Sequence, residues 1–449
     1  MQSLKTAILT CTALMLILGC SSKQGFQATN TAYVYDSKEL APRPEFVVHH
    51  LSGDISRIYY RISSTDLLYM RQPESNTYKA NFSLIFNLVP SFEIVERLDS
   101  GVVSIEDESS HLPQKALTGY FDINTSEQTP DKQYVLTLKM VDLNRQVEFD
   151  HFLRIDKRSE QTSENFLMTD TAGQVIYKEH IPLNVPFLLD YTSQPVARYI
   201  VSFYQRDFPL ALPPYSSVNT PSFKLDPDSI FSVAADKPIT FSEHGFYHFR
   251  VDTSQWSGFT VFSFYNEFPF VAKREHLSPP LRYLTTKDEY EKLASTFGNA
   301  AKTKEVVDDF WLERSGSLER SKILIEAFYN RVQLANIFFS SYLEGWKSDR
   351  GIIYIIYGPP NRVYSSTAGE AWVYGDEASS LSYYFNFIKV SNPFTDNDYS
   401  LERMNSYRYG WGQAIEAWRN GHIYNSKDIK REQDEQQQSQ YRQRSPYWY

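Results

Sequence analysis

The chain has 449 residues and a formal net charge of −9 at pH 7, with 45 basic residues against 54 acidic ones. This length predicts about three domains at roughly 100–200 residues each. A modestly acidic chain without a basic block is not expected to bind nucleic acid or to dock electrostatically on anionic lipid. The abundant aromatic residues (32 Tyr, 30 Phe and 7 Trp) favour β-sheet packing and rigid contact surfaces.

Residues 1–19 have the pattern of a signal peptide. Lys5 precedes an apolar run from Ala7 to Leu18 that is too short to span a membrane as a permanent helix. The run ends in Ile17-Leu18-Gly19-Cys20, which resembles the lipobox where signal peptidase II cuts before the cysteine. We therefore expect a lipoprotein signal over 1–19 and lipidation of Cys20, the alternative being an ordinary signal peptide with a chance cysteine.

Cleavage at that position has consequences for charge, thiols and location. It removes one Lys, so the net charge changes from −9 to −10, and Cys11 leaves with the signal. With Cys20 acylated no disulfide is expected, and stability must come from burial. The bilayer is then a partner through Cys20, on an outer-membrane protein that faces the periplasm. Residues 20–44 are polar and patternless, and we expect them to form a tether.

Residues 45–157 show an apolar period of two, which predicts β-strands. The segments 58–62, 80–88 and 134–141 alternate or run apolar over strand-like lengths. Residues 158–275 show the same pattern, with further expected strands at 165–170, 175–178 and 197–204 and a closing hairpin over 245–265. Short strands without helical periodicity predict two antiparallel β-sandwiches, Ig-like in class.

After Pro280 the apolar period changes to 3.6, which predicts an α+β domain over 276–425. Thr286 and Glu289 have the spacing of a capping box, and a short helix is expected over 303–311. A long helix is expected from about Leu318. Its apolar stripe comprises Ile323, Ala327, Phe328, Val332, Ala335, Ile337, Phe338 and Phe339.

The end of this helix and the segment after it are predicted from glycine and β-branched residues. Gly345 is expected to close the helix in a left-handed conformation. Residues 352–357 are a β-branched and aromatic run, expected to be a buried strand that forms a small sheet with 371–374 and 382–388. From Asn425 onward the chain is polar, and we expect solvated helix or disorder there. The aromatic tip of this polar tail, which covers 426–449, is expected either to bind a partner groove or to fold back on its own domain.

The segment between helix and strand carries the most specific motif. Gly345, Trp346, Ser348, Asp349, Arg350 and Gly351 are followed by a run that ends in Tyr357-Gly358-Pro359-Pro360. This pattern resembles the signature of the GWxTD-domain family, lipoproteins and periplasmic proteins of Bacteroidota and related bacteria, with Ser348 in place of the family's Thr. Supporting matches are Phe310-Trp311, Arg314, Tyr329 to Val332, and Trp372-Val373-Tyr374. The resemblance covers roughly 280–425 and implies a fold, often on an outer-membrane lipoprotein, without an established chemistry.

The motif is expected to be mainly structural. Ser348 or Asp349 can accept hydrogen bonds from turn N–H groups, Arg350 can pair with a carboxylate, and Trp346 can fill the core beneath the turn. Glu326 and Arg331 are candidate members of the same network. The competing interpretation is an acid–base site at Asp349, but no catalytic residue and no cofactor is predicted.

Known catalytic and metal-binding patterns are missing from the sequence. No GxSxG elbow, phosphate loop or dinucleotide fingerprint occurs, and Gly358-Pro359-Pro360 lacks the N–H groups of a phosphate loop. His49 and His50 are adjacent, so on a strand they point to opposite faces and cannot share one ion. No metal site is therefore predicted.

Three functions from different classes remain open at this stage. The favoured one is a non-enzymatic lipoprotein that acts as a structural or assembly subunit of an envelope complex, with envelope or outer-membrane proteins as partners. The second is a glycan- or polymer-binding accessory lipoprotein. The third is a periplasmic hydrolase that uses Asp349.

Overall fold

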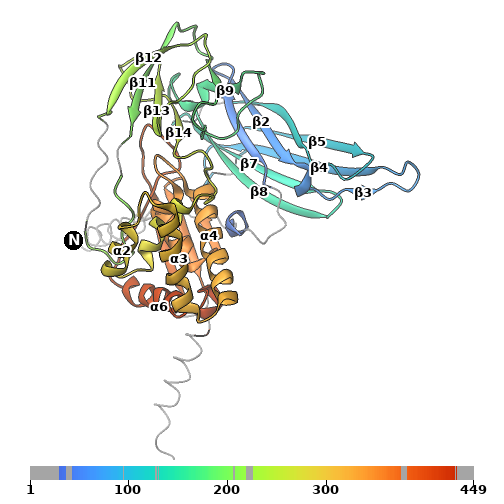
Figure 1. Ribbon diagram of the computed structural model, residues 1–449. Coiled ribbons are helices and arrows are strands. Elements are labelled where there is room, and N and C mark those ends of the chain that lie inside the picture. The colour runs from blue at the N-terminus through green and yellow to red at the C-terminus, as the bar shows by residue number, and fades with distance from the viewer. Residues whose placement is uncertain are drawn as a thin grey trace, which may run out of the picture.

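The computed structural model describes residues 30–36, 43–94, 96–126, 129, 131–205, 208–218, 226–375, 382–429 and 431. In Figure 1 the sheets of two β-rich parts lie together, and the helices of a third part, coloured yellow to red, pack below them. Antiparallel sheets dominate the N-terminal parts, and helices with one further sheet make up the C-terminal part.

The first β-rich part consists of two antiparallel sheets that share one core. The smaller sheet contains β1 (Glu45–His50), β2 (Ile55–Ser63) and β6 (Ala116–Asn124). The larger contains β3 (Met70–Arg71), β4 (Tyr78–Val89), β5 (Asp99–Ser109), β7 (Gln133–Asp142) and β8 (Val147–Asp156). Alternate residues of β2, β4 and β7 meet in a single apolar cluster, which confirms the strands predicted at 58–62, 80–88 and 134–141.

The second β-rich part also surrounds its own apolar cluster. Its sheets are β10–β9 and β12–β11–β13–β14. The strands are β9 (Phe166–Asp170), β10 (Phe187–Tyr191), β11 (Arg198–Tyr204), β12 (Ser229–Ala234), β13 (Gly245–Arg250) and β14 (Phe259–Ser263). The predicted closing hairpin is confirmed as β13 paired with β14. The strand expected over 175–178 is wrong, because only Val175 makes a bridge, to Thr169.

The C-terminal part packs helices on a four-stranded antiparallel sheet in the order β15–β16–β17–β18. The strands are β15 (Arg362–Ser365), β16 (Gly369–Tyr374), β17 (Tyr383–Lys389) and β18 (Tyr399–Leu401). The helices are α2 (Lys287–Ala294), α3 (Ala300–Ser315), α4 (Leu318–Phe339), α5 (Asp349–Tyr357) and α6 (Tyr407–Arg419). Short 3₁₀ turns occur along the whole described chain and not only in this part. They are η1 (Ala32–Tyr35), η2 (Ser64–Asp66), η3 (Ser163–Asn165), η4 (Arg274–His276), η5 (Pro279–Tyr283) and η6 (Gly345–Lys347).

Two predictions about these helices are confirmed and one is corrected. The capping box is present, since Thr286 and Glu289 each accept a backbone N–H from the other. Helix α4 begins at Leu318 as expected. Its buried face is turned relative to the predicted stripe, because Ile323 and Ile337 are 57% and 50% exposed. Polar Arg331 and Asn336 occupy buried places instead, and an apolar pattern could not identify them.

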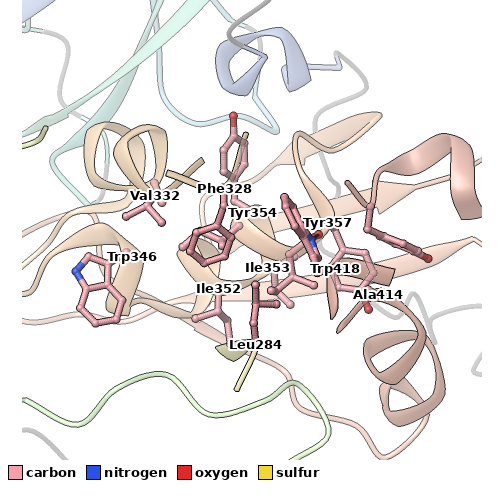
Figure 2. Packing of buried hydrophobic residues seen from close by; sticks show 14 of the residues in the cluster. Leu284, Phe328, Val332, Trp346, Ile352, Ile353, Tyr354, Tyr357, Ala414 and Trp418 are labelled. Carbon is pink, nitrogen blue, oxygen red and sulfur yellow. Dashed lines mark hydrogen bonds between the residues drawn. The ribbon is translucent and has the colours of Figure 1, made fainter. Parts of the chain in front are cut away.

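The strand predicted over 352–357 is wrong, because this segment is the helix α5. Every residue from Arg350 to Tyr357 is buried, and Figure 2 shows Ile352, Ile353 and Tyr354 in the middle of the C-terminal core. A run that is apolar on all sides fits a buried helix as well as a buried strand, and periodicity cannot separate the two. The hydroxyl of Ser348 accepts the Gly351 N–H at 3.0 Å, so the helix has an N-cap that the six apolar letters do not reveal.

The C-terminal end of α5 is held by a buried arginine from α4. Arg331 donates to the carbonyls of Ile355 and Ile356 at 3.0 and 3.1 Å, and to that of Tyr424 at 2.7 Å. Trp418 donates to the Ile356 carbonyl as well, at 3.0 Å. Burial lowers the pKa of Arg331 to about 10, so it remains a cation at neutral pH. A cation at this place satisfies carbonyls that the helix leaves open and offsets its negative end.

Both flanking segments depart from prediction. The polar tether expected over 20–44 is wrong for residues 30–36, because Ala32 and Tyr35 are buried in the C-terminal core. The solvated tail expected after Asn425 is likewise wrong at its start, because Ile429 belongs to the same core. Residues 20–29, 37–42 and 432–449, with the aromatic tip, lie outside the described residues. Among the helices that are described, none has the length and apolar character needed to cross a membrane.

The arginine cap gives a first prediction. Arg331→Met keeps much of the side-chain volume but removes the donors, so three buried carbonyls lose a partner. We expect a loss of about 3 kcal/mol or more in the free energy of unfolding of the C-terminal part. Urea unfolding followed by tryptophan fluorescence measures it. Lys322→Met, on the exposed side of the same helix, is the matched control and should change little. Equal unfolding curves for the two variants would contradict this role of Arg331.

Candidate functional site

The motif residues lie where α4 ends and α5 begins, around the turn η6. Gly345 donates its N–H to the Ser340 hydroxyl at 2.9 Å, and Trp346 donates its N–H to Asn336 Oδ1 at 3.2 Å. Gly345 does not have a positive φ angle, so the predicted left-handed helix end is wrong. A Cβ at this position would lie 1.9 Å from the Ala335 carbonyl oxygen. The glycine is therefore needed for close approach of the turn to α4.

Gly351 serves the same close packing one turn later. A Cβ there would lie 1.9 Å from the Gly345 carbonyl oxygen. Between the two glycines, Ser348 donates its hydroxyl to the Gly345 carbonyl at 2.8 Å while it accepts the Gly351 N–H. The serine thus ties the turn to the first turn of α5, and either Ser or Thr can provide this hydroxyl.

Trp346 fills the core under the turn, as predicted, and is 7% exposed. Trp346 also lines a hollow of about 730 Å³ between the second β-rich part and the helices. Aromatic and charged side chains line this hollow, among them Tyr265, Tyr290, Arg282 and Lys347.

Asp349 makes a nearly buried ion pair with Arg403. Its Oδ2 accepts the Leu401 N–H at 2.8 Å and Arg403 Nη1 at 3.1 Å, and its Oδ1 accepts Arg403 Nη2. Burial raises the pKa of the Asp349 carboxyl, while Arg403 and the Leu401 N–H oppose that shift. The carboxylate also lies in the first turn of α5, where the helix dipole favours negative charge. Both carboxylate oxygens are engaged, so Asp349 joins α5 to β18.

Arg350 belongs to a second buried network. It is 3% exposed, and its Nη1 lies 3.5 Å from Glu370 Oε1. Glu370 also accepts the Tyr35 hydroxyl at 3.0 Å and Trp372 Nε1 at 2.9 Å. Arg350 Nη2 donates to both the backbone and the side-chain oxygen of Asn397. Burial lowers the pKa of Arg350, but Glu370 together with Tyr35 and Tyr399 outweighs this effect, and the pKa is raised.

The last motif residues close α5. The Tyr357 ring packs 5.2 Å from that of Phe385 in β17. Gly358 has a φ of +81°, and its carbonyl accepts the Tyr374 hydroxyl at 2.8 Å. Pro359 is partly buried and Pro360 is buried, after the end of the helix.

The arrangement does not resemble a reaction centre. The polar atoms of Ser348, Asp349 and Arg350 for which bonds are described are bound to other groups of the fold rather than directed into a cleft. Within the described ranges, no three His, Cys, Asp or Glu side chains gather as metal ligands. His50 contacts the Ser56 hydroxyl at 2.9 Å and the Asp156 carbonyl at 3.0 Å, as hydrogen-bonded histidines of a core do.

Sequence reasoning found the motif but missed the residues that hold it. Asp349 does not meet the expected partners: Arg331 caps the far end of α5 and Glu326 is exposed. Its actual partner, Arg403, lies more than fifty positions away. Glu370 lies two residues before Trp372, which the motif comparison had identified. Residues two apart on a strand share one face, and this spacing was the sequence feature that could have indicated Glu370. Nothing in the polar segment before residue 43 indicated Tyr35.

The fold and this buried motif define a chain with two β-rich parts and a C-terminal α+β part built around one short helix. Residues 245–420 match the family model described as the GWxTD domain. The chain therefore carries a GWxTD domain, as the motif predicted. The match begins at β13, within the second β-rich part, and ends just after α6. Comparison with curated proteins gave no match.

The close approach at Gly345 gives the second prediction. Gly345→Ala should cost about 3 kcal/mol or more, because the added methyl group meets a backbone carbonyl that cannot move without bending α4. Gly412→Ala is the matched control. Its Cβ would meet nothing within 4 Å, and alanine favours the interior of α6, so this variant should be neutral or slightly stabilised. Thermal unfolding of both variants decides it, and similar melting temperatures would contradict the packing argument.

The third prediction concerns the pair that joins α5 to β18. Asp349→Ala leaves Arg403 nearly buried without its carboxylate, and we expect a loss of about 3–5 kcal/mol. The double variant with Arg403→Leu should lose less than the two single variants together, because the stranded cation is gone. Glu291→Ala, which breaks an exposed pair with Lys287, should cost less than about 0.5 kcal/mol. An Asp349→Ala protein with wild-type stability but lost activity would instead indicate a ligand or catalytic role.

Proposed function

We propose that this protein is a non-enzymatic lipoprotein of the outer membrane that acts as a structural or assembly subunit of a cell-envelope protein complex. Lipidation at Cys20 attaches it to the bilayer, and it faces the periplasm. Its partners are envelope or outer-membrane proteins. As part of this proposal, the two β-rich parts are antiparallel sandwiches of Ig-like class.

The observation that supports this proposal best is the complete engagement of the motif inside the fold. Asp349 has both carboxylate oxygens bound by Arg403 and a backbone N–H, so neither is free to accept a proton from a substrate. Arg350 and Glu370 bind each other and their neighbours in the same way. A motif used in this manner stabilises a domain, and the domain then presents its surface to partners. These contacts favour the assembly role over a hydrolase that would use Asp349.

A second candidate, binding of a glycan or polymer, is favoured by the hollow beside Trp346. Tyr265 and Tyr290 line it together with charged groups, including Arg282. Aromatic faces and hydrogen-bonding groups at one place are typical of sugar-binding grooves. The same hollow is also suited to a loop of a partner protein, so it does not favour glycan binding over the assembly role.

The fourth prediction tests the proposed function. A tagged full-length protein, expressed at its native level and extracted from the outer membrane in mild detergent, should bring down envelope proteins in stoichiometric amount. Cys20→Ala should release the protein from the membrane fraction, and Cys11→Ala is the matched control. Recovery of the wild-type protein alone would contradict the assembly role, and binding in a glycan array that Tyr290→Ala abolishes would establish the second candidate.

A further inference from the structure

The segment Asn30–Asp36 lies against the GWxTD domain as a bound peptide would, and we call it the strap. Figure 1 shows its 3₁₀ turn as the short dark-blue helix beside α4. It forms hydrogen bonds with residues more than one hundred positions away, in the C-terminal part and on β8. A contact nearer in sequence comes from Arg43, which donates to the Asp36 carbonyl at 3.0 Å.

The first half of the strap pairs with the backbone of β15, the outer strand of the C-terminal sheet. The Thr31 N–H donates to the Val363 carbonyl, and the Val363 N–H donates to Asn30 Oδ1, both at 3.0 Å. Asn30 Nδ2 reaches the Asn361 carbonyl at 3.3 Å. The outer strand of a sheet offers unpaired N–H and C=O groups, and a bound peptide can form hydrogen bonds with them.

The second half of the strap inserts one aromatic anchor. The Tyr35 ring lies 5.5, 5.2 and 5.2 Å from the rings of Phe338, Phe339 and Trp372. Its hydroxyl donates to Glu370 Oε1 at 3.0 Å, and its carbonyl accepts the Tyr354 hydroxyl at 2.7 Å. Burial raises the pKa of the Tyr35 hydroxyl, which therefore stays protonated and able to donate. One buried aromatic group with a satisfied polar tip is the usual form of an interface anchor.

The pocket that receives this anchor is built without the strap. Glu370 is held by Arg350 of α5 and Trp372 of β16. Arg350 is held in turn by Asn397, from the segment before β18. A hollow of about 350 Å³ adjoins the same residues and continues toward Phe152 and Arg154 of β8. The strap therefore supplies one partner of Glu370 and leaves space beside it.

We propose that this groove is a peptide-binding site of the GWxTD domain, and that the chain occupies it with its own strap as an exchangeable ligand. A partner segment that displaces the strap must offer a donor to the Val363 carbonyl and an acceptor to the Val363 N–H, and it must carry a tyrosine for the Glu370 pocket. The site goes beyond the assembly role proposed above, and its test does not depend on lipidation.

The fifth prediction is tested on the full chain with a protease site inserted within residues 37–42. After cutting, only non-covalent contacts hold the strap, because the effective concentration that a short linker provides is lost. A fluorescent peptide with the sequence of residues 30–36 should then bind saturably, measured by anisotropy. The Tyr35→Phe peptide keeps the ring but lacks the hydroxyl that Glu370 accepts, and it should bind roughly tenfold to one-hundredfold more weakly.

Two controls keep the result open to contradiction. The uncut protein should bind the peptide much more weakly than the cut one, because its own strap competes. A peptide of the same composition in scrambled order should not bind. If the cut protein loses its cooperative unfolding transition, or keeps it and binds no peptide, the strap is an integral part of the fold and the proposal is overturned.

Discussion

The ends of helix α5 have N–H and C=O groups without a partner inside the helix, and the helix is buried from Arg350 to Tyr357. Other groups of the C-terminal part form hydrogen bonds with them. An unsatisfied buried backbone group costs about as much as a lost hydrogen bond, so a short helix buried on all sides needs partners at both ends. Ser348 provides a partner at the start of the helix, and Arg331 and Trp418 provide partners at its end. The apolar contacts in Figure 2 follow from this burial, but the polar ends make it possible.

The charges at the two ends are not interchangeable. Asp349 stands at the positive end of α5 and Arg331 at its negative end, so the dipole assists both. Arg403, the partner of Asp349, and Glu370, the partner of Arg350, both come from segments that follow α5 in the chain. Because removal of one member of a buried pair leaves a charge without compensation, these contacts specify the fold through the cost of breaking them. The motif residues thus hold a buried helix in place. Their polar groups are bound within the fold for this reason.

Sequence patterns predicted the elements that have one apolar face and one polar face, because such elements show a clear apolar period. Alternation along β2, β4 and β7 and the capping box of Thr286 were sufficient, because one face of each element is apolar and the other is polar. The pattern failed at α5, where all faces are apolar and strand and helix look alike. It failed again at residues 30–36, because a short polar segment carries no period and its order comes from contacts with residues far along the chain. Within the site, the glycines were recognised but not the reason for them, since a close approach to Ala335 is a property of the folded packing.

The position of Tyr35 has a geometric consequence for a lipid-anchored chain. Only the nine residues 21–29 separate Cys20 from Asn30, where contact with β15 begins. Fully extended, nine residues span about 30 Å, which is close to the thickness of the hydrocarbon core of a bilayer. A lipid on Cys20 would therefore hold the edge of the C-terminal sheet within that distance of the membrane surface. The C-terminal part would then lie close to the membrane. The first β-rich part is nearer to the anchor in sequence, but its position would be set by the GWxTD domain.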